Sequence, residues 1–299
     1  MENIKTGLNG NLAKKIFGSQ NNAVEYLIRL NESKLIPFLN FKIVHRGQNS
    51  EKKVLKINTE DLWKAVVDTW DYENSKRIIR KMFTESEKYR SGKVADTVMN
   101  KFINEWQSLK LGDISWPFSQ GAFDEFVQRV NSGKATAVEK DEEVKNAAVK
   151  YRRIKEINTV RNDFIETLIF EKNENVLPTL NHRRGVDFFI DGISFDQKVA
   201  KSPTTEFKRH FGEGWKRMAI EKPELVSEYL YKYQDEGRFG ADPRLLIVYI
   251  DEDVPINTIR DIISKADLNH PIEISFTYKH KNQGEKSYKV PCIVILLYN

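Results

Sequence analysis

The chain has 299 residues, which is enough for one large domain or two ordinary ones. Hydrophobic residues make up 40% of it and charged residues 30%, so the composition predicts a packed core and excludes wholesale disorder. The net charge of +5 is mildly basic, which permits nucleic-acid binding without requiring it.

Membrane, secretory and zinc-binding roles are not expected. No apolar run approaches the roughly 18 residues of a membrane span, and the N-terminus lacks the apolar core of a signal peptide. The single cysteine, Cys292, cannot form an internal disulfide and lies in a hydrophobic run, so we expect it to be buried. The scattered histidines argue against a zinc site. A cytoplasmic protein fits these features.

The first 135 residues are predicted to be mainly α-helical. Helices are expected at residues 11–17, 21–30, 76–89, 94–109 and 122–130, and residues 45–53 are predicted to form an exposed loop. A further helix begins after Asn58, which can cap it while Asp61 occupies its third position. Leu62, Val66 and Trp70 then recur at every fourth position, which predicts one buried stripe.

The second half of the sequence predicts strands between helices. The charged residues 135–150 indicate a connecting helix at a domain boundary, and residues 151–172 a more apolar helix. Strands are expected at residues 186–190, 193–199, 244–251, 272–279 and 288–298, and helices at residues 223–234 and 256–266. The prediction is an α/β fold, with a mixed sheet flanked by helices in a domain at residues 136–299 and a helical domain at residues 1–135.

Two of these strands form the hairpin that organises the site. Asp191-Gly192 separates two apolar runs and suits a two-residue type I′ turn, because both turn positions need positive φ. Such a turn sets the register from Ile190 opposite Ile193 to Asp187 opposite Asp196. Facing residues share one side of the sheet, with Cβ atoms about 4.5–5.5 Å apart.

This register predicts a cation site. Opposed carboxylates repel each other, and a divalent cation reverses that effect because hard cations take carboxylate oxygens. Lys198 lies two residues beyond Asp196 on the same face, where it could orient a water or neutralise developing charge. The alternative is an exposed face of two solvated carboxylates bridged by Lys198 or Arg184. Phe189, on the same face as Asp187, favours the covered, functional interpretation.

Asp187 at the start of one strand and Asp196-Gln197-Lys198 on the next resemble the motif of the PD-(D/E)XK nuclease superfamily, which has the restriction-endonuclease-like fold. The upstream helix and the downstream helix and buried strand extend the resemblance over residues 150–251. It implies that Asp187 and Asp196 bind Mg²⁺, that Gln197 ligates through its main-chain carbonyl, and that Lys198 is the catalytic lysine. Val186 stands where the motif has proline, and aspartate rather than glutamate opens the triplet.

In that superfamily a glutamate on the preceding helix often completes the site. Glu166 is the best match here, as a catalytic residue and further metal ligand, ahead of Glu171 and Glu174. An ordinary solvent-facing helix residue is the alternative for Glu166.

The resemblance implies a Mg²⁺-dependent endodeoxyribonuclease, most like a type II restriction enzyme. It would bind one or two Mg²⁺ per site, with Mn²⁺ as a substitute, and cut double-stranded DNA as a homodimer. A structure-specific or repair nuclease, a nuclease toxin, and a non-catalytic DNA-binding protein on the same scaffold are the alternatives. The N-terminal domain would recognise DNA, dimerise, or do both.

Basic side chains around the hairpin are candidates for phosphate contacts, with a solvated surface as the alternative. They are His182, Arg183, Arg184, Lys201, Lys208, Arg209, Lys216 and Arg217.

Overall fold

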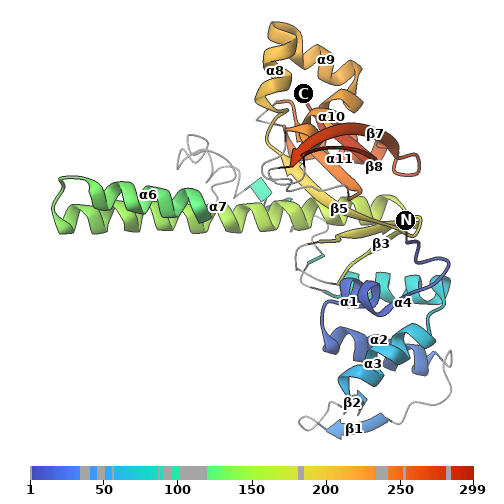
Figure 1. Cartoon of the computed structure of the whole chain (residues 1–299). Helices are drawn as coiled ribbons and strands as arrows, with labels where there is room; N and C mark the ends of the chain where they lie inside the picture. The colour runs from blue at the N-terminus through green and yellow to red at the C-terminus, as the bar shows by residue number, and fades with distance from the viewer. Residues whose placement is uncertain are drawn as a thin grey trace. The chain divides into compact units, whose positions relative to one another are not determined.

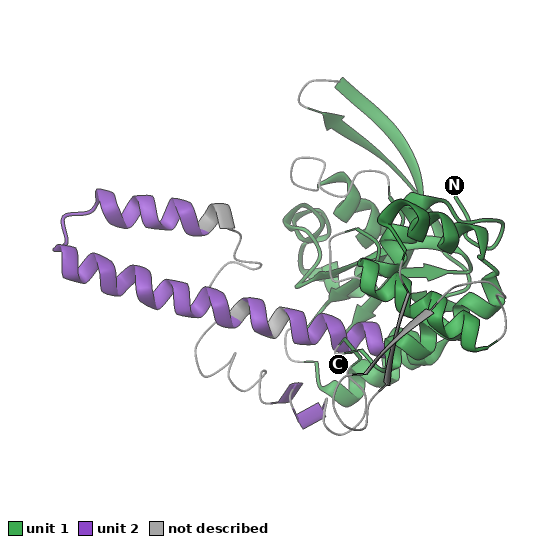
Figure 2. Ribbon diagram, turned by 90° about the horizontal axis from the view of Figure 1, so that it is seen from below, with its two compact units in different colours: residues 1–89, 168–299 green, residues 90–167 purple. Residues whose placement is uncertain are grey.

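The computed structural model describes residues 2–33, 41–45, 51–55, 57–86, 88–89, 96–97, 99–100, 120–180, 185–233, 242–251, 254–280 and 284–299. The chain forms two compact units (Figure 2): unit 1 comprises residues 1–89 and 168–299, and unit 2 comprises residues 90–167. Unit 1 therefore takes in both ends of the chain, and its limits differ from the predicted boundary after residue 135. Recognition or dimerisation by the N-terminal region stays a prediction.

Unit 1 combines helices from both ends of the chain with strands. Its helices are α1 (Gly10–Phe17), α2 (Gln20–Glu32), α3 (Thr59–Asp68), α4 (Tyr72–Thr84), α8 (Thr205–Phe211), η2 (Gly212–Gly214), α9 (Trp215–Glu221), α10 (Pro223–Lys232) and α11 (Ile256–Lys265). Its strands are β1 (Phe41–His45), β2 (Glu51–Leu55), β3 (Val176–Pro178), β4 (Phe188–Ile190), β5 (Ile193–Ala200), β6 (Arg244–Tyr249), β7 (Ile272–His280) and β8 (Gly284–Leu297).

Six of the strands form one mixed sheet in the order β3-β4-β5-β6-β8-β7. β6 runs parallel to β5 and to β8, and the other neighbouring pairs are antiparallel. The predicted α/β fold, a mixed sheet flanked by helices, is thus confirmed. β6 is buried over its first five residues, as its continuous apolar run predicts, and Cys292 on β8 is buried as expected.

The turn between β4 and β5 confirms the predicted hairpin. Asp191 has φ 52° and Gly192 has φ 84°, so both turn residues are in the left-handed region that a type I′ turn requires. The strands pair with Ile190 opposite Ile193 and Phe188 opposite Phe195, as predicted, and the paired register ends there, one residue before the predicted pair of Asp187 with Asp196. The start of the chain binds this turn, because the Ile4 amide donates to the Gly192 carbonyl over 3.0 Å.

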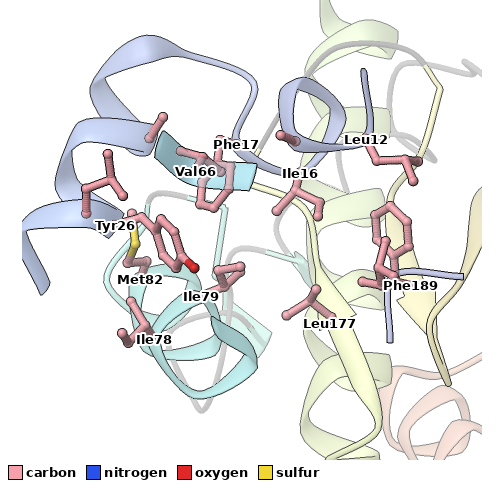
Figure 3. Close-up of a cluster of buried hydrophobic side chains, with 14 of the residues drawn as sticks. Leu12, Ile16, Phe17, Tyr26, Val66, Ile78, Ile79, Met82, Leu177 and Phe189 are labelled. Carbon is pink, nitrogen blue, oxygen red and sulfur yellow. The ribbon is translucent and has the colours of Figure 1, made fainter. Parts of the chain in front are cut away.

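Helices α1 to α4 pack at the β3 end of the sheet, and α10 packs at the β7 end (Figure 1). The core at the β3 end joins Ile16, Phe17 and Tyr26 of α1 and α2 to Leu177 of β3 and Phe189 of β4 (Figure 3). The N-terminal helices therefore share one hydrophobic core with the hairpin, and they hold the strand pair from which the candidate site is built.

The caps of these helices follow the sequence. Asn58 accepts a hydrogen bond from the Asp61 amide at 2.9 Å, so it caps α3 as predicted. The predicted loop at residues 45–53 is wrong in part, because β1 and β2 occupy both of its ends and pair antiparallel. Each of those strands is only five residues long, and a polar segment separates them, so the period-2 signal is weak.

Unit 2 contains α6 (Gln120–Ser132) and most of α7 (Ala137–Lys172). The sequence predicts two helices over residues 135–172, and the structure has one helix of 36 residues. Neither glycine nor proline interrupts this stretch. Thr136 and Glu139 form a capping box, in which the Thr136 amide donates to the Glu139 carboxylate and the Glu139 amide to the Thr136 hydroxyl.

Candidate active site

The first candidate ligand, Asp187, stands just before β4, where the hairpin ladder changes. Its amide donates to the Phe195 carbonyl over 3.0 Å, and its own carbonyl accepts from the Thr179 amide at 2.9 Å. Its carboxylate oxygen Oδ2 lies 2.7 Å from the Gln197 amide nitrogen and accepts that hydrogen bond. The Asp187 side chain thus continues the pairing with β5 where the backbone ladder stops, and it is fixed beside the Asp196-Gln197-Lys198 triplet.

Asp196, in the middle of β5, is the buried member of the acidic pair, with a side chain only 9% exposed. Lys198 follows it on the same face, and the Lys198 Nζ lies 2.8 Å from the Asp196 carboxylate. The Lys198 side chain is 35% exposed, so it is less buried than the carboxylate that it binds. This is the relation that the alternation of a strand predicts for residues two apart.

A second cation, Arg244, binds Asp196 and is absent from the sequence prediction. Arg244 opens β6, and the parallel register places it opposite Asp196, with which its guanidinium forms an ion pair. Its side chain is 5% exposed, and burial lowers the pKa of Arg244 while the negative charge of Asp187 acts in the opposite direction. Arg244 is therefore within electrostatic reach of both carboxylates.

The sequence does carry a signal for Arg244. A charged residue at the head of an apolar strand that is buried on both faces needs a partner of opposite charge. That Asp196 is the partner of Arg244 depends on the parallel pairing of β5 with β6, and no local sequence pattern predicts that pairing.

Two carboxylates, Asp187 and Asp196, thus lie within electrostatic reach of the Arg244 guanidinium, and Lys198 binds the second of them. Carboxylate oxygens are the ligands that Mg²⁺ prefers, so Asp187 and Asp196 fit this ion by donor chemistry. Within the described ranges, however, no group of three or more His, Cys, Asp or Glu side chains is arranged to hold a metal ion. A metal ion at this site would bind the carboxylates of Asp187 and Asp196, and at Asp196 it would compete with Arg244.

Glu166, the predicted third carboxylate, lies on the part of α7 that belongs to unit 2, and it is buried. The other two candidates are in unit 1 and exposed at the surface: Glu171 accepts a hydrogen bond from the Tyr89 hydroxyl at 2.8 Å, and Glu174 lies beyond the end of α7. The prediction that Glu166 completes the acidic group stays a prediction.

The predicted phosphate-binding residues fall into two sets. His182, Arg183 and Arg184 lie outside the described residues. Of the others, Lys201 is half-buried just beyond β5, and the remaining four are on α8 and α9, which contact each other: Lys208, Arg209, Lys216 and Arg217.

This basic section of the chain, for which the sequence predicts no regular element, is helical from Thr205 onwards. Thr204 caps α8 by accepting from the Phe207 amide at 3.1 Å. Two of the basic side chains lie near the Trp215 ring, with the Nζ atoms of Lys208 and Lys216 at 4.8 Å and 5.8 Å from its centroid. Lys216 also pairs with Asp251 at 2.5 Å. Binding of DNA by these helices stays a prediction.

Searches for similarity add no family to this description. No helix among the described residues has the length and apolar character needed to cross a membrane. Comparisons of the chain with protein-family models, with curated proteins and with solved structures find no match.

Proposed function

We propose that this protein is a Mg²⁺-dependent endodeoxyribonuclease, most like a type II restriction enzyme with a PD-(D/E)XK catalytic domain. The observation that carries the proposal is the clustering of Asp187, Asp196 and Lys198 around the β4–β5 hairpin. The Gln197 amide binds the first carboxylate, and the Lys198 ammonium group binds the second. The β4–β5 hairpin brings these residues together, whereas their spacing in the sequence alone is a weak motif.

The residues have separate roles in the proposed reaction. Asp187 and Asp196, with the Gln197 main-chain carbonyl, would hold one or two Mg²⁺, for which Mn²⁺ could substitute. A bound metal would polarise the phosphate and lower the pKa of the attacking water. Lys198, whose ammonium group binds Asp196, would stabilise the negative charge that develops on the phosphate.

The proposed substrate is double-stranded DNA, whose phosphates the basic side chains of α8 and α9 would contact. Cutting both strands requires two active sites, so the proposed enzyme is a homodimer. Its proposed location is the cytoplasm. Cleavage of branched, nicked and single-stranded DNA in parallel with duplex DNA separates a restriction enzyme from a repair nuclease or a toxin.

The test is cleavage of unmethylated plasmid or phage DNA with Mg²⁺ and, as a blank, with EDTA. Asp187→Asn, Asp196→Asn and Lys198→Met keep side-chain volume and remove charge, and each should lower the cleavage rate by about 100-fold or more. Asp191→Asn is the matched control. It removes a carboxylate from the same hairpin at φ 52°, where asparagine is well tolerated, and should cleave as the unaltered protein does. Equal cleavage by all four variants would sink the assignment.

A non-catalytic DNA-binding protein is the second candidate, and one observation favours it. Asp196 already has two cationic partners, Lys198 and Arg244, so its charge is balanced without a metal. Calorimetric titration with Mg²⁺ or Mn²⁺ decides between the candidates, because a nuclease should show a saturable site that Asp187→Asn and Asp196→Asn remove. DNA binding without such a site supports the second candidate.

A further inference from the structure

Arg244 binds the carboxylate of Asp196, the same group that would coordinate the proposed metal ion. The Arg244–Asp196 ion pair joins β6 to β5 in the middle of the sheet, and both side chains are at least nine-tenths buried. A buried carboxylate is costly without a positive partner, so this pair stabilises the metal-free sheet against the loss of either member.

A divalent cation and Arg244 would compete for the carboxylate of Asp196. The guanidinium and the cation have charges of the same sign, and charges at contact distance in a buried site repel strongly because little solvent screens them. Lys198 is less buried than Arg244, so rotation of its long side chain could carry the ammonium group away from a bound cation. Binding of a metal at Asp196 therefore favours a movement of the Arg244 head group away from the carboxylate.

The surroundings offer Arg244 a second acceptor. Its Nη2 lies 3.8 Å from an oxygen of Asp242, a carboxylate whose side chain is 80% exposed. The backbone of Asp242 is held in place, because its carbonyl accepts a hydrogen bond from the buried Tyr231 hydroxyl at 2.9 Å. A rotation of the Arg244 side chain from Asp196 to Asp242 would take its charge from the buried site to the surface.

We propose that Arg244 is an internal counter-ion that balances Asp196 in the metal-free protein and is displaced to Asp242 when a divalent cation binds. The proposal rests on the metal site of the proposed nuclease. It makes Arg244 a positioning residue: the side chain keeps the two acidic strands together without metal, and its competition with the cation sets the metal affinity.

The experiment compares the full-length protein with Arg244→Gln and Arg244→Lys. Calorimetry with Mg²⁺ and with Mn²⁺ gives metal affinity, and thermal unfolding in EDTA gives the stability of the metal-free form. Arg244→Gln should bind the cation more tightly by about 10- to 100-fold, the range over which groups beside the ligands alter metal affinity. It should also unfold roughly 5–15 °C lower in EDTA, and Mn²⁺ should recover much of that loss.

Two further variants and one chemical probe make the result specific. Arg244→Lys keeps the charge, so its metal affinity should lie near that of the unaltered protein. Arg29→Gln removes another paired arginine, which binds Glu25 on α2 and Glu85 just after α4, and should leave metal affinity unchanged. Phenylglyoxal, read by peptide mass spectrometry, should modify Arg244 of the unaltered protein faster with Mg²⁺ than with EDTA.

The outcomes separate this proposal from the proposed function. Saturable binding of equal or lower affinity in Arg244→Gln, with no change in the modification of Arg244, overturns the counter-ion role and leaves the metal site standing. Absence of saturable binding in both the unaltered protein and Arg244→Gln overturns both proposals. If Arg244→Gln does not fold, the modification rates of the unaltered protein decide.

Discussion

Gly192 is the residue on which the geometry of the hairpin depends most, and we expect Gly192→Ala to be strongly destabilising. Its φ of 84° lies in the left-handed region, where alanine costs about 1–2 kcal/mol. An added Cβ would also lie 2.1 Å from the Asn3 Oδ1 and 2.9 Å from the Asn3 Cγ, so Asn3 would have to move. The substitution therefore tests the turn and the attachment of the chain's N-terminal segment at once.

Moving Asn3 breaks two hydrogen bonds. Its Oδ1 accepts from the Lys5 amide at 2.9 Å, and its Nδ2 donates to the Asp191 carbonyl over 3.3 Å. At a net value of about 1 kcal/mol for the better of these bonds, and less for the longer, the displacement adds about 1–2 kcal/mol. Gly192→Ala should thus lower the free energy of unfolding by about 2–4 kcal/mol in all.

Urea unfolding in a double-mutant cycle separates the two contributions. In an Asn3→Ala background the added Cβ no longer clashes with the Asn3 side chain. Gly192→Ala should then cost only the backbone strain of about 1–2 kcal/mol. Gly214→Ala is the matched control, since φ there is −81° and nothing lies within 4 Å of an added Cβ. It should change the free energy of unfolding by less than about 0.5 kcal/mol. If Gly192→Ala costs the same in both Asn3 backgrounds, the clash with Asn3 contributes nothing. If it costs almost nothing in either, the backbone strain at Gly192 is refuted.

Two further expectations concern buried polar groups. The Tyr26 and Ser75 hydroxyl oxygens are 2.6 Å apart in the core, so Tyr26→Phe should lower the free energy of unfolding in urea by about 1–2 kcal/mol, and Ser75→Ala added to it should restore part of the loss. Burial raises the pKa of the Cys292 thiol from 9.0 to about 12, so a thiol reagent at pH 8 should label it only after unfolding. Because the folded form holds this proton more tightly, its contribution to stability is complete below pH 9 and is lost towards pH 12, and Cys292→Ala should reduce that alkaline loss.

Local chemistry accounts for the parts of the fold that the sequence predicts. The Asp191-Gly192 turn, the Asn58 cap and the apolar run of β6 each depend on residues that are adjacent in the chain. The hairpin register follows from the turn alone, and the alternation of side chains along β5 predicts that Lys198 lies beside Asp196 without any knowledge of the remaining strands.

Long-range packing decides what the sequence does not predict. Arg244 meets Asp196 through a parallel strand pair formed by segments far apart in sequence, and the N-terminal helices join the sheet through Leu177 and Phe189. In α8 and α9 the difficulty is composition. Phe207, Phe211, Trp215 and Ala219 recur at every fourth position and contribute to one core, but the basic residues around them conceal the period.

The attachment of the N-terminal segment to the hairpin turn has a consequence for synthesis of the chain on the ribosome. Asn3 binds Asp191, which is 188 residues later in the sequence. At about 5–20 residues per second, the apolar face of α1 is made roughly 10–40 s before the turn to which the N-terminal segment binds. During that interval Leu12, Ile16 and Phe17 are without Leu177 and Phe189, their later core neighbours. The nascent chain is then exposed to aggregation, and chaperones that bind apolar helices should recognise this stretch first.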